Sequence, residues 1–383
     1  MDSQSGETSM DTKLPKRIQK MRSDFLQIKP SISIDRAIAT TEVYKQYSNI
    51  PTIELRAKAF FRACETIPLH IGAYEMIVGR PAGKPRAGVF CPEIAWRWLE
   101  RELDTVSTRP QDPYDLEEKD KKILKEDIFP FWEGRSVEEV FFAKVKNIGI
   151  LPLLHESGVL DAEVKASSGA GEFSPGFRDI VFEKGFKGIK RDAQKELESL
   201  SFLNQEDHEK LYFLRAVETT CDGVILLAQR YADLAGKMAA KESDQARKQE
   251  LKNISEICRH VPAEPPQSFH EALQAIWIVQ VALFLEENAP SLSPGRIDQY
   301  LWPYYQKDIE KGSLTKEHAQ VLMYCFLLKF NEIPWLLNEF AAMYYAGYMA
   351  FQNVVVGGQT RDGSDATNEL SHMVLTCTKN LKL

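Results

Sequence analysis

The sequence predicts one helix-rich α/β domain that contains a few buried strands. After Leu14, most apolar residues recur near the 3.6-residue spacing of amphipathic helices. Two short segments, Glu75–Gly79 and Gln352–Gly358, have instead the apolar composition of buried strands. Of the 383 residues, 44% are hydrophobic and 27% are charged, which is the balance of a globular protein. Because residues 15–383 contain neither an internal repeat nor a disordered linker, we expect a single domain there, preceded by a flexible tail at residues 1–14.

In the N-terminal part, apolar spacing predicts helices over residues 34–46 and 51–66. A loop rich in proline and glycine follows the first expected strand. Asp115, with Glu118 three residues later, is the acidic form of a capping box and predicts the start of another helix. Pro130 is expected to end that helix, because proline has no N–H to donate to the preceding turn.

Residues 147–179 contain five glycines and have no clear period, so we expect a mobile or functional loop. Regular structure then returns, with helices predicted from apolar spacing and from capping residues. These helices are residues 208–240, residues 243–260, a very apolar helix from the capping box Ser268–Glu271 to near Leu285, a helix that Thr315 begins, and a last helix capped by Ser364 or Asp365.

The charge and cysteine content exclude several classes of protein. A net charge of −7 makes the chain a poor candidate for binding nucleic acid, which needs basic faces. The six cysteines form no Cys-x-x-Cys pair and are widely spread, so we interpret them as reduced thiols of a cytosolic protein. The first residues lack a signal peptide, and the apolar stretch Ala272–Leu285 is shorter than the roughly 20 residues that span a membrane. We therefore expect a cytoplasmic protein that binds neither nucleic acid nor membrane.

Common metal and nucleotide motifs are absent from the sequence. His270–Glu271 lacks the second histidine of a zinc-binding His-Glu-x-x-His segment. Gly79–Lys84 is one residue too short between its glycines for a phosphate-binding loop, and Pro85 stands where a magnesium-binding hydroxyl is needed. Gly169–Gly171 begins like a dinucleotide-binding segment, but the third glycine, Gly176, comes too late. The sequence therefore predicts no metal site and no nucleotide site.

Three loops combine glycine and proline with polar side chains beside very apolar elements. They are Ser167–Asp179, Asn288–Tyr300 and Tyr345–Asn353. This composition is typical of the wall of a pocket for a small ligand. An alternative interpretation is that Arg296 and Asp298 form a structural ion pair and that the glycines only serve turns.

Six segments in register carry a resemblance to a known family. They are Ile34–Ala37, Glu75–Gly79, Phe129–Trp132, Lys184–Ile189, Ser293–Tyr300, and Gln352–Gly358 with Asp365–Asn368. Through them the chain resembles the glycyl radical enzymes of the pyruvate formate-lyase superfamily. The resemblance is strongest to the branch of B12-independent glycerol and propanediol dehydratases and formate acetyltransferase-like proteins.

The resemblance implies radical chemistry on a small metabolite. In this family, a separate iron–sulfur enzyme that uses S-adenosylmethionine takes a hydrogen atom from a backbone glycine. The radical passes to a cysteine, whose thiyl radical takes hydrogen from the substrate. The family fold is a barrel of two parallel half-sheets wrapped in helices, and the full-length form is expected to be a homodimer. The expected fold class is therefore α/β, as the helix-rich half of such a barrel, with one parallel half-sheet.

The chain departs from the family pattern at the catalytic positions. The family carries its thiyl cysteine in a Gly-Cys-Val-Glu-type loop and its radical glycine in an Arg-Val-x-Gly-Tyr-type loop, and neither occurs here. We therefore expect the N-terminal portion of an enzyme, truncated before both loops, with no catalytic residue and no activity alone. The alternative is a non-catalytic remnant or a binding module that associates with an activase or a full-length paralogue.

The resemblance also implies a substrate site at Glu172, Ser291 and Tyr348. Dehydratases of this branch hold a diol with a histidine and a serine at the start of the Ser-Pro-Gly-Arg loop. Ser291 matches that serine, whereas Pro290 takes the place of the histidine. Glu172 follows Gly171, where those dehydratases carry another histidine, so a carboxylate would serve there as general base or hydroxyl acceptor.

We expect Glu172 and Ser291 to face one cavity, within about 10 Å of each other, because pockets for small metabolites are compact. Arg296 and Asp298 are assigned a supporting role that pins the loop, since a guanidinium suits a carboxylate partner. The two changes from histidine indicate a substrate other than glycerol, either a hydroxylated small molecule or a short oxoacid.

Overall fold

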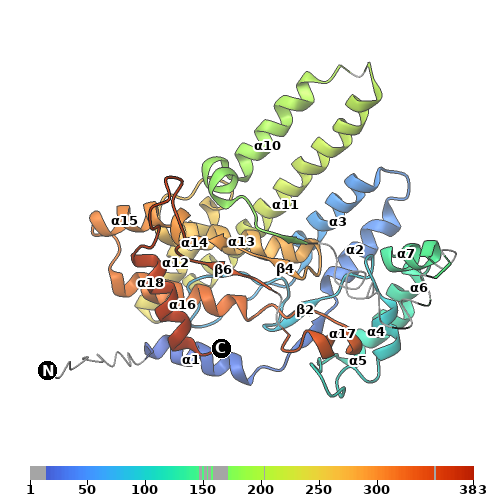
Figure 1. The fold of residues 1–383 in the computed structure, drawn as a ribbon, viewed down its shortest axis with the longest axis horizontal. Helices are drawn as coiled ribbons and strands as arrows, with labels where there is room; N and C mark the ends of the chain where they lie inside the picture. The colour runs from blue at the N-terminus through green and yellow to red at the C-terminus, as the bar shows by residue number, and fades with distance from the viewer. Residues whose placement is uncertain are drawn as a thin grey trace.

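The structure, a computed structural model, describes residues 14–145, 149–150, 153, 157, 171–201, 203–348 and 351–383. Nearly all of the expected tail and the first four residues of the loop Ser167–Asp179 lie outside these ranges. Helices dominate the described part of the chain (Figure 1). They are α1 (Lys16–Gln27), α2 (Asp35–Gln46), α3 (Thr52–Thr66), α4 (Arg97–Glu102), α5 (Glu118–Ile123), α6 (Phe129–Trp132), α7 (Val137–Val145), α10 (Phe182–Ser199), α11 (Gln205–Lys241), α12 (Gln245–His260), α13 (Phe269–Glu286), α14 (Ile297–Tyr300), α15 (Trp302–Glu310), α16 (Lys316–Phe330), α17 (Glu339–Tyr344) and α18 (Glu369–Leu381), with π-helical turns at Leu124–Ile128 and Phe177–Val181.

The strands of the described residues form three two-stranded sheets, each of them parallel. The pairs are β1 (Ser31–Ser33) with β2 (Ala87–Val89), β3 (Glu172–Phe173) with β4 (Ser291–Leu292), and β5 (Gly295–Arg296) with β6 (Val354–Val355). Helices with small parallel sheets confirm the expected fold class. Only two residues separate β4 from β5, so the chain passes directly from the second sheet into the third.

The larger of two hydrophobic cores is built around α13. Ser268 caps this helix, since its side chain accepts a hydrogen bond from the backbone N–H of Glu271 at 3.2 Å. By length and composition α13 could cross a membrane, but 78% of it is buried inside the molecule, as in other core helices. The second core is formed by residues of α2, α4, α6 and the π-helical turn Leu124–Ile128 and includes Trp96, Trp98 and Trp132. Strand residues belong to both cores, Leu292 of β4 to the first and Ile32 of β1 with Val89 of β2 to the second.

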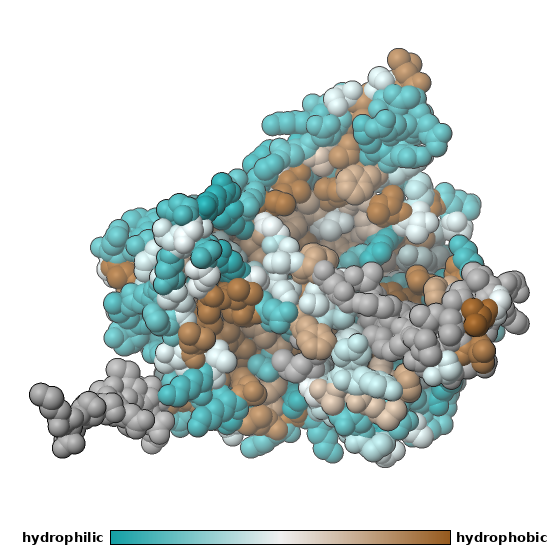
Figure 2. All heavy atoms as spheres, viewed as in Figure 1, coloured by the Kyte–Doolittle hydropathy of each residue, from teal (hydrophilic) through white to brown (hydrophobic). Residues whose placement is uncertain are grey.

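The hairpin of α10 and α11 projects from the body of the molecule (Figure 1). Asn204 caps α11, accepting a hydrogen bond from the N–H of Asp207 at 2.8 Å. Below the hairpin, apolar side chains of α3, α10, α11 and α13 line a groove of about 430 Å³. Figure 2 shows apolar atoms on this inner side of the hairpin.

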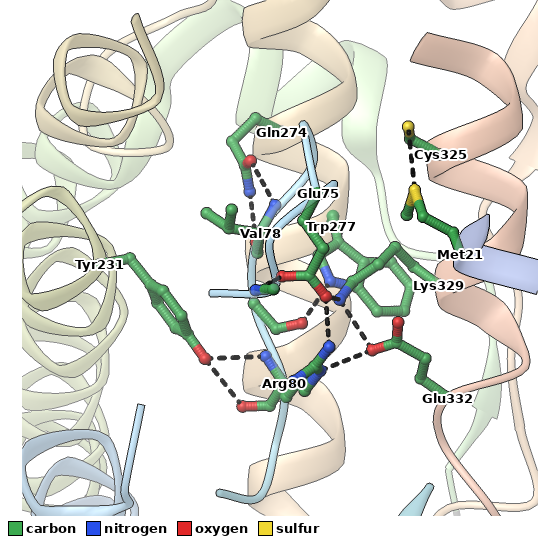
Figure 3. A network of polar contacts seen from close by, with 12 residues as sticks. Met21, Glu75, Val78, Arg80, Tyr231, Gln274, Trp277, Cys325, Lys329 and Glu332 are labelled. Carbon is green, nitrogen blue, oxygen red and sulfur yellow. Dashed lines mark hydrogen bonds and ion pairs between the residues drawn. The ribbon is translucent and has the colours of Figure 1, made fainter. Parts of the chain in front are cut away.

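Glu75–Gly79 is buried as expected, but it is not a strand, and its backbone bends at Met76 and Ile77. Its backbone is bonded by side chains of α13 instead of by another strand (Figure 3). Gln274 accepts from the N–H of Val78 at 2.9 Å and donates to its carbonyl at 2.7 Å, and Trp277 donates to the carbonyl of Gly79 at 2.9 Å. The prediction of a strand was wrong because burial alone does not reveal which partner satisfies the backbone.

Two predicted helix ends also differ from the structure. Pro130 does not end the helix that begins after Glu117, since the helical run continues from α5 through the π-helical turn Leu124–Ile128 into α6 and ends at Trp132. The last helix is capped by Asn368, not by Ser364 or Asp365. Asn368 accepts from the N–H groups of Leu370 and Ser371, so that α18 begins with a complete capping box.

A closed group of four charged side chains fixes the Glu75–Arg80 segment against α16 (Figure 3). Arg80 and Lys329 each pair with both Glu75 and Glu332, and the exposed fraction of each side chain is 10% or less. Burial by itself raises the pKa of Glu75, but the charges of Lys329 and Arg80 lower this pKa to about 2. Glu75 is therefore ionised at neutral pH.

Candidate functional site

The pairing of β3 with β4 makes Glu172 and Ser291 direct neighbours in register. The N–H of Ser291 donates to the carbonyl of Gly171 at 3.1 Å, and the N–H of Ser293 donates to the carbonyl of Phe173 at 3.0 Å. Gly171 must be a glycine for this approach, since a Cβ there would lie 2.9 Å from the Cβ of Ala289. The two positions expected to share a site are thus adjacent, although the side chain of Glu172 lies outside the described part of the structure.

The hydroxyl of Ser291 lies on the side of the strand away from the core. Leu292 is 1% exposed, whereas Ser291 is partly exposed, in agreement with the alternation of side chains along a strand. Ser291 Oγ donates to the carbonyl of Phe351 at 2.9 Å, and the N–H of Phe351 donates to the carbonyl of Pro290 at 2.8 Å. Because the hydroxyl proton is used, Oγ can act toward a ligand hydroxyl only as an acceptor, through its two lone pairs.

The loop that leads into Ser291 is held on both sides. Buried Arg36 donates to the last carbonyls of α13, those of Leu285 at 2.6 Å and Glu286 at 2.7 Å. Asn288 pairs with the backbone of Leu336, donating to its carbonyl at 2.8 Å and accepting from its N–H at 3.2 Å. These contacts place the serine before any ligand binds, which is what a binding site requires of its supporting residues.

Arg296 and Asp298 do not form the ion pair considered above; both bind the backbone of Gly357 instead. Arg296 donates to the carbonyl of Gly357 at 2.5 Å and to that of Gln359 at 3.1 Å. Asp298, which is fully buried, accepts from the N–H of Gly357 at 2.6 Å and from the hydroxyl of Ser371. The turn after β6 is therefore held at both the carbonyl and the N–H of Gly357. Arg296 and Asp298 each bind these backbone groups and not the side chain of the other.

The side chain of Tyr348 contacts Pro113 and Tyr114 and is not directed to Ser291. Its hydroxyl donates to the carbonyl of Pro113 at 3.1 Å, and its ring packs edge-on against Tyr114 with centroids 5.4 Å apart. The carboxylate of Asp112 accepts from the N–H of Tyr348, whose φ is +66°. We interpret Tyr348 as an anchor of the loop to the second core rather than as a ligand-binding residue.

The structure adds aromatic residues to the wall beside Ser291. Phe351 is 47% exposed and Tyr345 is 38% exposed, and their ring centroids lie 6.1 Å apart. Trp335 packs against both rings at 6.0 and 5.4 Å. The loop composition had indicated Tyr345–Asn353 as a pocket wall. Trp335 carries no sequence signal beyond an aromatic residue after Pro334, and only the fold brings it here.

The described residues contain no group of three or more His, Cys, Asp or Glu side chains that could hold a metal ion. All six cysteines are free thiols and are buried. Burial raises the pKa of Cys91, Cys258 and Cys325 to about 12, so these thiols stay protonated at neutral pH. None of them is prepared for nucleophilic chemistry.

Comparison with known proteins places this geometry in a family. A family model described as pyruvate formate lyase-like matches residues 10–383. The chain belongs to this family. It is 34% identical to the trans-4-hydroxy-L-proline dehydratase of Clostridioides difficile, over 96% of this chain and 46% of that protein. It is 32% identical to an isethionate sulfite-lyase of Oleidesulfovibrio alaskensis, over 100% of this chain and 47% of that protein.

Solved structures of the family superpose closely on the chain. A structure that concerns 1,2-propanediol dehydration in Roseburia inulinivorans matches with a TM-score of 0.92 and 36% identity, over 96% of this chain and 46% of that one. The glycerol-bound B12-independent glycerol dehydratase of Clostridium butyricum matches with a TM-score of 0.90 and 33% identity, over 97% and 46%. The chain therefore spans about half the length of the relatives it matches.

Proposed function

We propose that this chain is the substrate-binding N-terminal portion of a glycyl radical dehydratase or lyase that acts on a small hydroxylated metabolite or a short oxoacid. The observation that carries the proposal is the fixed Ser291 strand. Its hydroxyl oxygen is turned away from the core, and position 172 lies directly beside it. Relatives named for hydroxyproline, propanediol and glycerol all act on hydroxylated molecules, which supports the same substrate class here.

In this proposal the two strand residues have different tasks. Ser291 Oγ accepts a hydrogen bond from a substrate hydroxyl and orients it. Glu172 accepts a second hydroxyl proton or acts as general base, the role that a carboxylate can take where a histidine is absent. Arg296 and Asp298 touch no substrate and keep the neighbouring turn in place.

The radical chemistry is proposed to belong to a remaining part of the enzyme. The 383 residues contain neither a Gly-Cys-Val-Glu-type nor an Arg-Val-x-Gly-Tyr-type segment. We therefore propose that this polypeptide alone turns over no substrate and that a separate activating enzyme, which uses S-adenosylmethionine and an iron–sulfur cluster, generates the radical in the whole protein. A cytoplasmic homodimer is the proposed form of that protein. A non-catalytic remnant or a binding module for an activase or a full-length paralogue remains the competing proposal.

A binding measurement tests the substrate site on the chain itself. Ligand-observed NMR with 1,2-propanediol, glycerol, trans-4-hydroxyproline and isethionate should detect at least one weak complex. Ser291→Ala should abolish it without changing the unfolding temperature appreciably, because the partly exposed hydroxyl adds only about 1 kcal/mol. Ser313→Ala is the matched control, since its hydroxyl also donates to a carbonyl oxygen, that of Asp308. Equal binding by the two variants would refute the proposal.

A further inference from the structure

Two glutamines interrupt the otherwise apolar helix α13, and they make different contacts. Gln274 is 1% exposed and Gln280 is fully buried. Both amide atoms of Gln274 are paired with the backbone of Val78 (Figure 3). Gln274 therefore forms a closed pair, which is the ordinary way in which a core amide is satisfied.

Gln280 instead connects two segments of the candidate site. Its Nε2 donates to the carbonyl of Leu292 in β4 and to Oε1 of Gln352 at 2.9 Å. Gln352 in turn donates to the carbonyl of Phe330 at 3.0 Å, at the end of α16. One buried amide thus fixes β4 relative to the segment that begins with Phe351.

Gln280 Oε1 has no hydrogen-bond partner among the residues that the structure describes, and it is buried. A buried acceptor without a donor costs free energy, and the neighbouring positions of α13 are filled by apolar residues that carry no such cost. A glutamine at this position is therefore not explained by the stability of the core alone. Its contribution is instead to hold together the two segments that its Nε2 binds, at Leu292 and at Gln352.

We propose that Gln280 is a positioning residue of the substrate site, an inference that rests on the proposed function. Through the carbonyl of Leu292 it fixes the strand that carries Ser291. Through Gln352 it fixes Phe351, whose carbonyl accepts the Ser291 hydroxyl at 2.9 Å. Gln280 touches no substrate; it sets the direction in which the two lone pairs of Ser291 Oγ point.

The test compares Gln280→Met with Gln274→Met in the 383-residue chain, with 1,2-propanediol as the probe. Both variants should unfold at a lower temperature, because each leaves buried backbone groups unpaired. Gln280→Met should weaken diol binding by about tenfold or more, the effect of one misplaced hydrogen bond. Gln274→Met should bind the diol as the wild type does. If both variants bind equally well, or lose binding equally, Gln280 has no positioning role.

Gln280→Glu provides a rescue that a general loss of packing would not show. Burial raises the pKa of a carboxyl group, so in mildly acidic solution this glutamate is neutral and its O–H donates to the Leu292 carbonyl. Diol binding should then approach that of the wild type at pH 6 and be lost at pH 9. Binding that does not change with pH in this variant would contradict the inference.

Hydrogen exchange separates failure of this inference from failure of the proposed function. The N–H groups of Ser291, Ser293 and Phe351 are bonded across the site, to the carbonyls of Gly171, Phe173 and Pro290. Gln280→Met should speed the exchange of these three N–H groups, whereas Gln274→Met should speed the exchange of the Val78 N–H instead. If these rates change but no ligand binds the wild type, the proposed function fails, although Gln280 still holds the strand that carries Ser291. If they do not change, the positioning role fails whatever the chain binds.

Discussion

At the scale of single residues, buried polar groups in this protein are satisfied by partners far away in the sequence. Glu75, Arg80, Lys329 and Glu332 come from two segments about 250 residues apart and neutralise one another. Removing one member of such a network leaves an unpaired buried charge, which costs more than the intact network contributes. The free energy of unfolding should therefore depend on pH through Glu75.

We predict that Glu75→Gln lowers the free energy of unfolding by about 3–5 kcal/mol at pH 7. The folded pKa of Glu75 is about 2, below its ordinary value of 4.5. A depressed carboxyl pKa stabilises the fold above pH 4.5, and this contribution is lost as the pH falls toward 2. Urea denaturation at several pH values should show the difference from wild type shrinking below pH 4.5. Glu118→Gln, whose side chain is 85% exposed, is the control, and a pH-independent difference would contradict the prediction.

At the scale of elements, hydrogen bonds at the two ends of α18 connect the segment that follows β5 to the rest of the molecule. Asn368 caps α18 and also donates from Nδ2 to the carbonyl of Asp298 at 3.0 Å. The other end of α18 is held by Arg22, which donates to the carbonyls of Leu381 and Lys382. The helix therefore connects α1 to α14, the short helix that follows β5.

Asn368→Ala should reduce the free energy of unfolding by about 2 kcal/mol, at the upper end of the range for a lost N-cap, because a tertiary hydrogen bond is lost with the cap. Asn204→Ala removes the cap of α11 on the exposed hairpin and should cost only about 1 kcal/mol. Chemical denaturation of both variants measures the two values. A cost for Asn204→Ala as large as that for Asn368→Ala would show that the contact with Asp298 adds nothing.

At the scale of the whole molecule, the strands leave apolar side chains exposed. Phe173 in β3 is 49% exposed, Phe351 is 47% exposed and Val355 in β6 is 44% exposed. In addition, no third strand of the described residues is hydrogen-bonded to the β3–β4 pair or to the β5–β6 pair. Apolar surface and open strand edges of this kind promote association between chains.

The chain should therefore associate as its concentration rises, as measured by size-exclusion chromatography with light scattering. Replacing Phe173 and Val355 together by serine should shift the equilibrium toward the monomer. Leu203→Ser is the control, because Leu203 is 89% exposed at the tip of the α10–α11 hairpin, away from the strands. A monomer that persists at high protein concentration in the wild type would count against the exposed strand face as the cause.

Local sequence signals were sufficient to predict those helices that are specified by contacts between residues close together in the chain. Ser268 and Thr315 cap the helices expected from them, and apolar spacing located α11 and α12 within a few residues. These features depend on contacts between residues three or four apart, which a sequence displays directly. The family, and with it the fold class, was recognisable from short segments in order.

Tertiary structure decided what each polar side chain of the site does. Arg296 and Asp298 bind Gly357, about 60 residues away, and not each other. Tyr348 turns its hydroxyl to Pro113, and Gln280 joins two loops that no periodicity relates. The sequence by itself indicated the family and several of the longer helices, because these depend on local spacing and matching segments. Hydrogen-bond partners depend on which distant backbone groups the packed cores leave unpaired, and only the folded chain determines that.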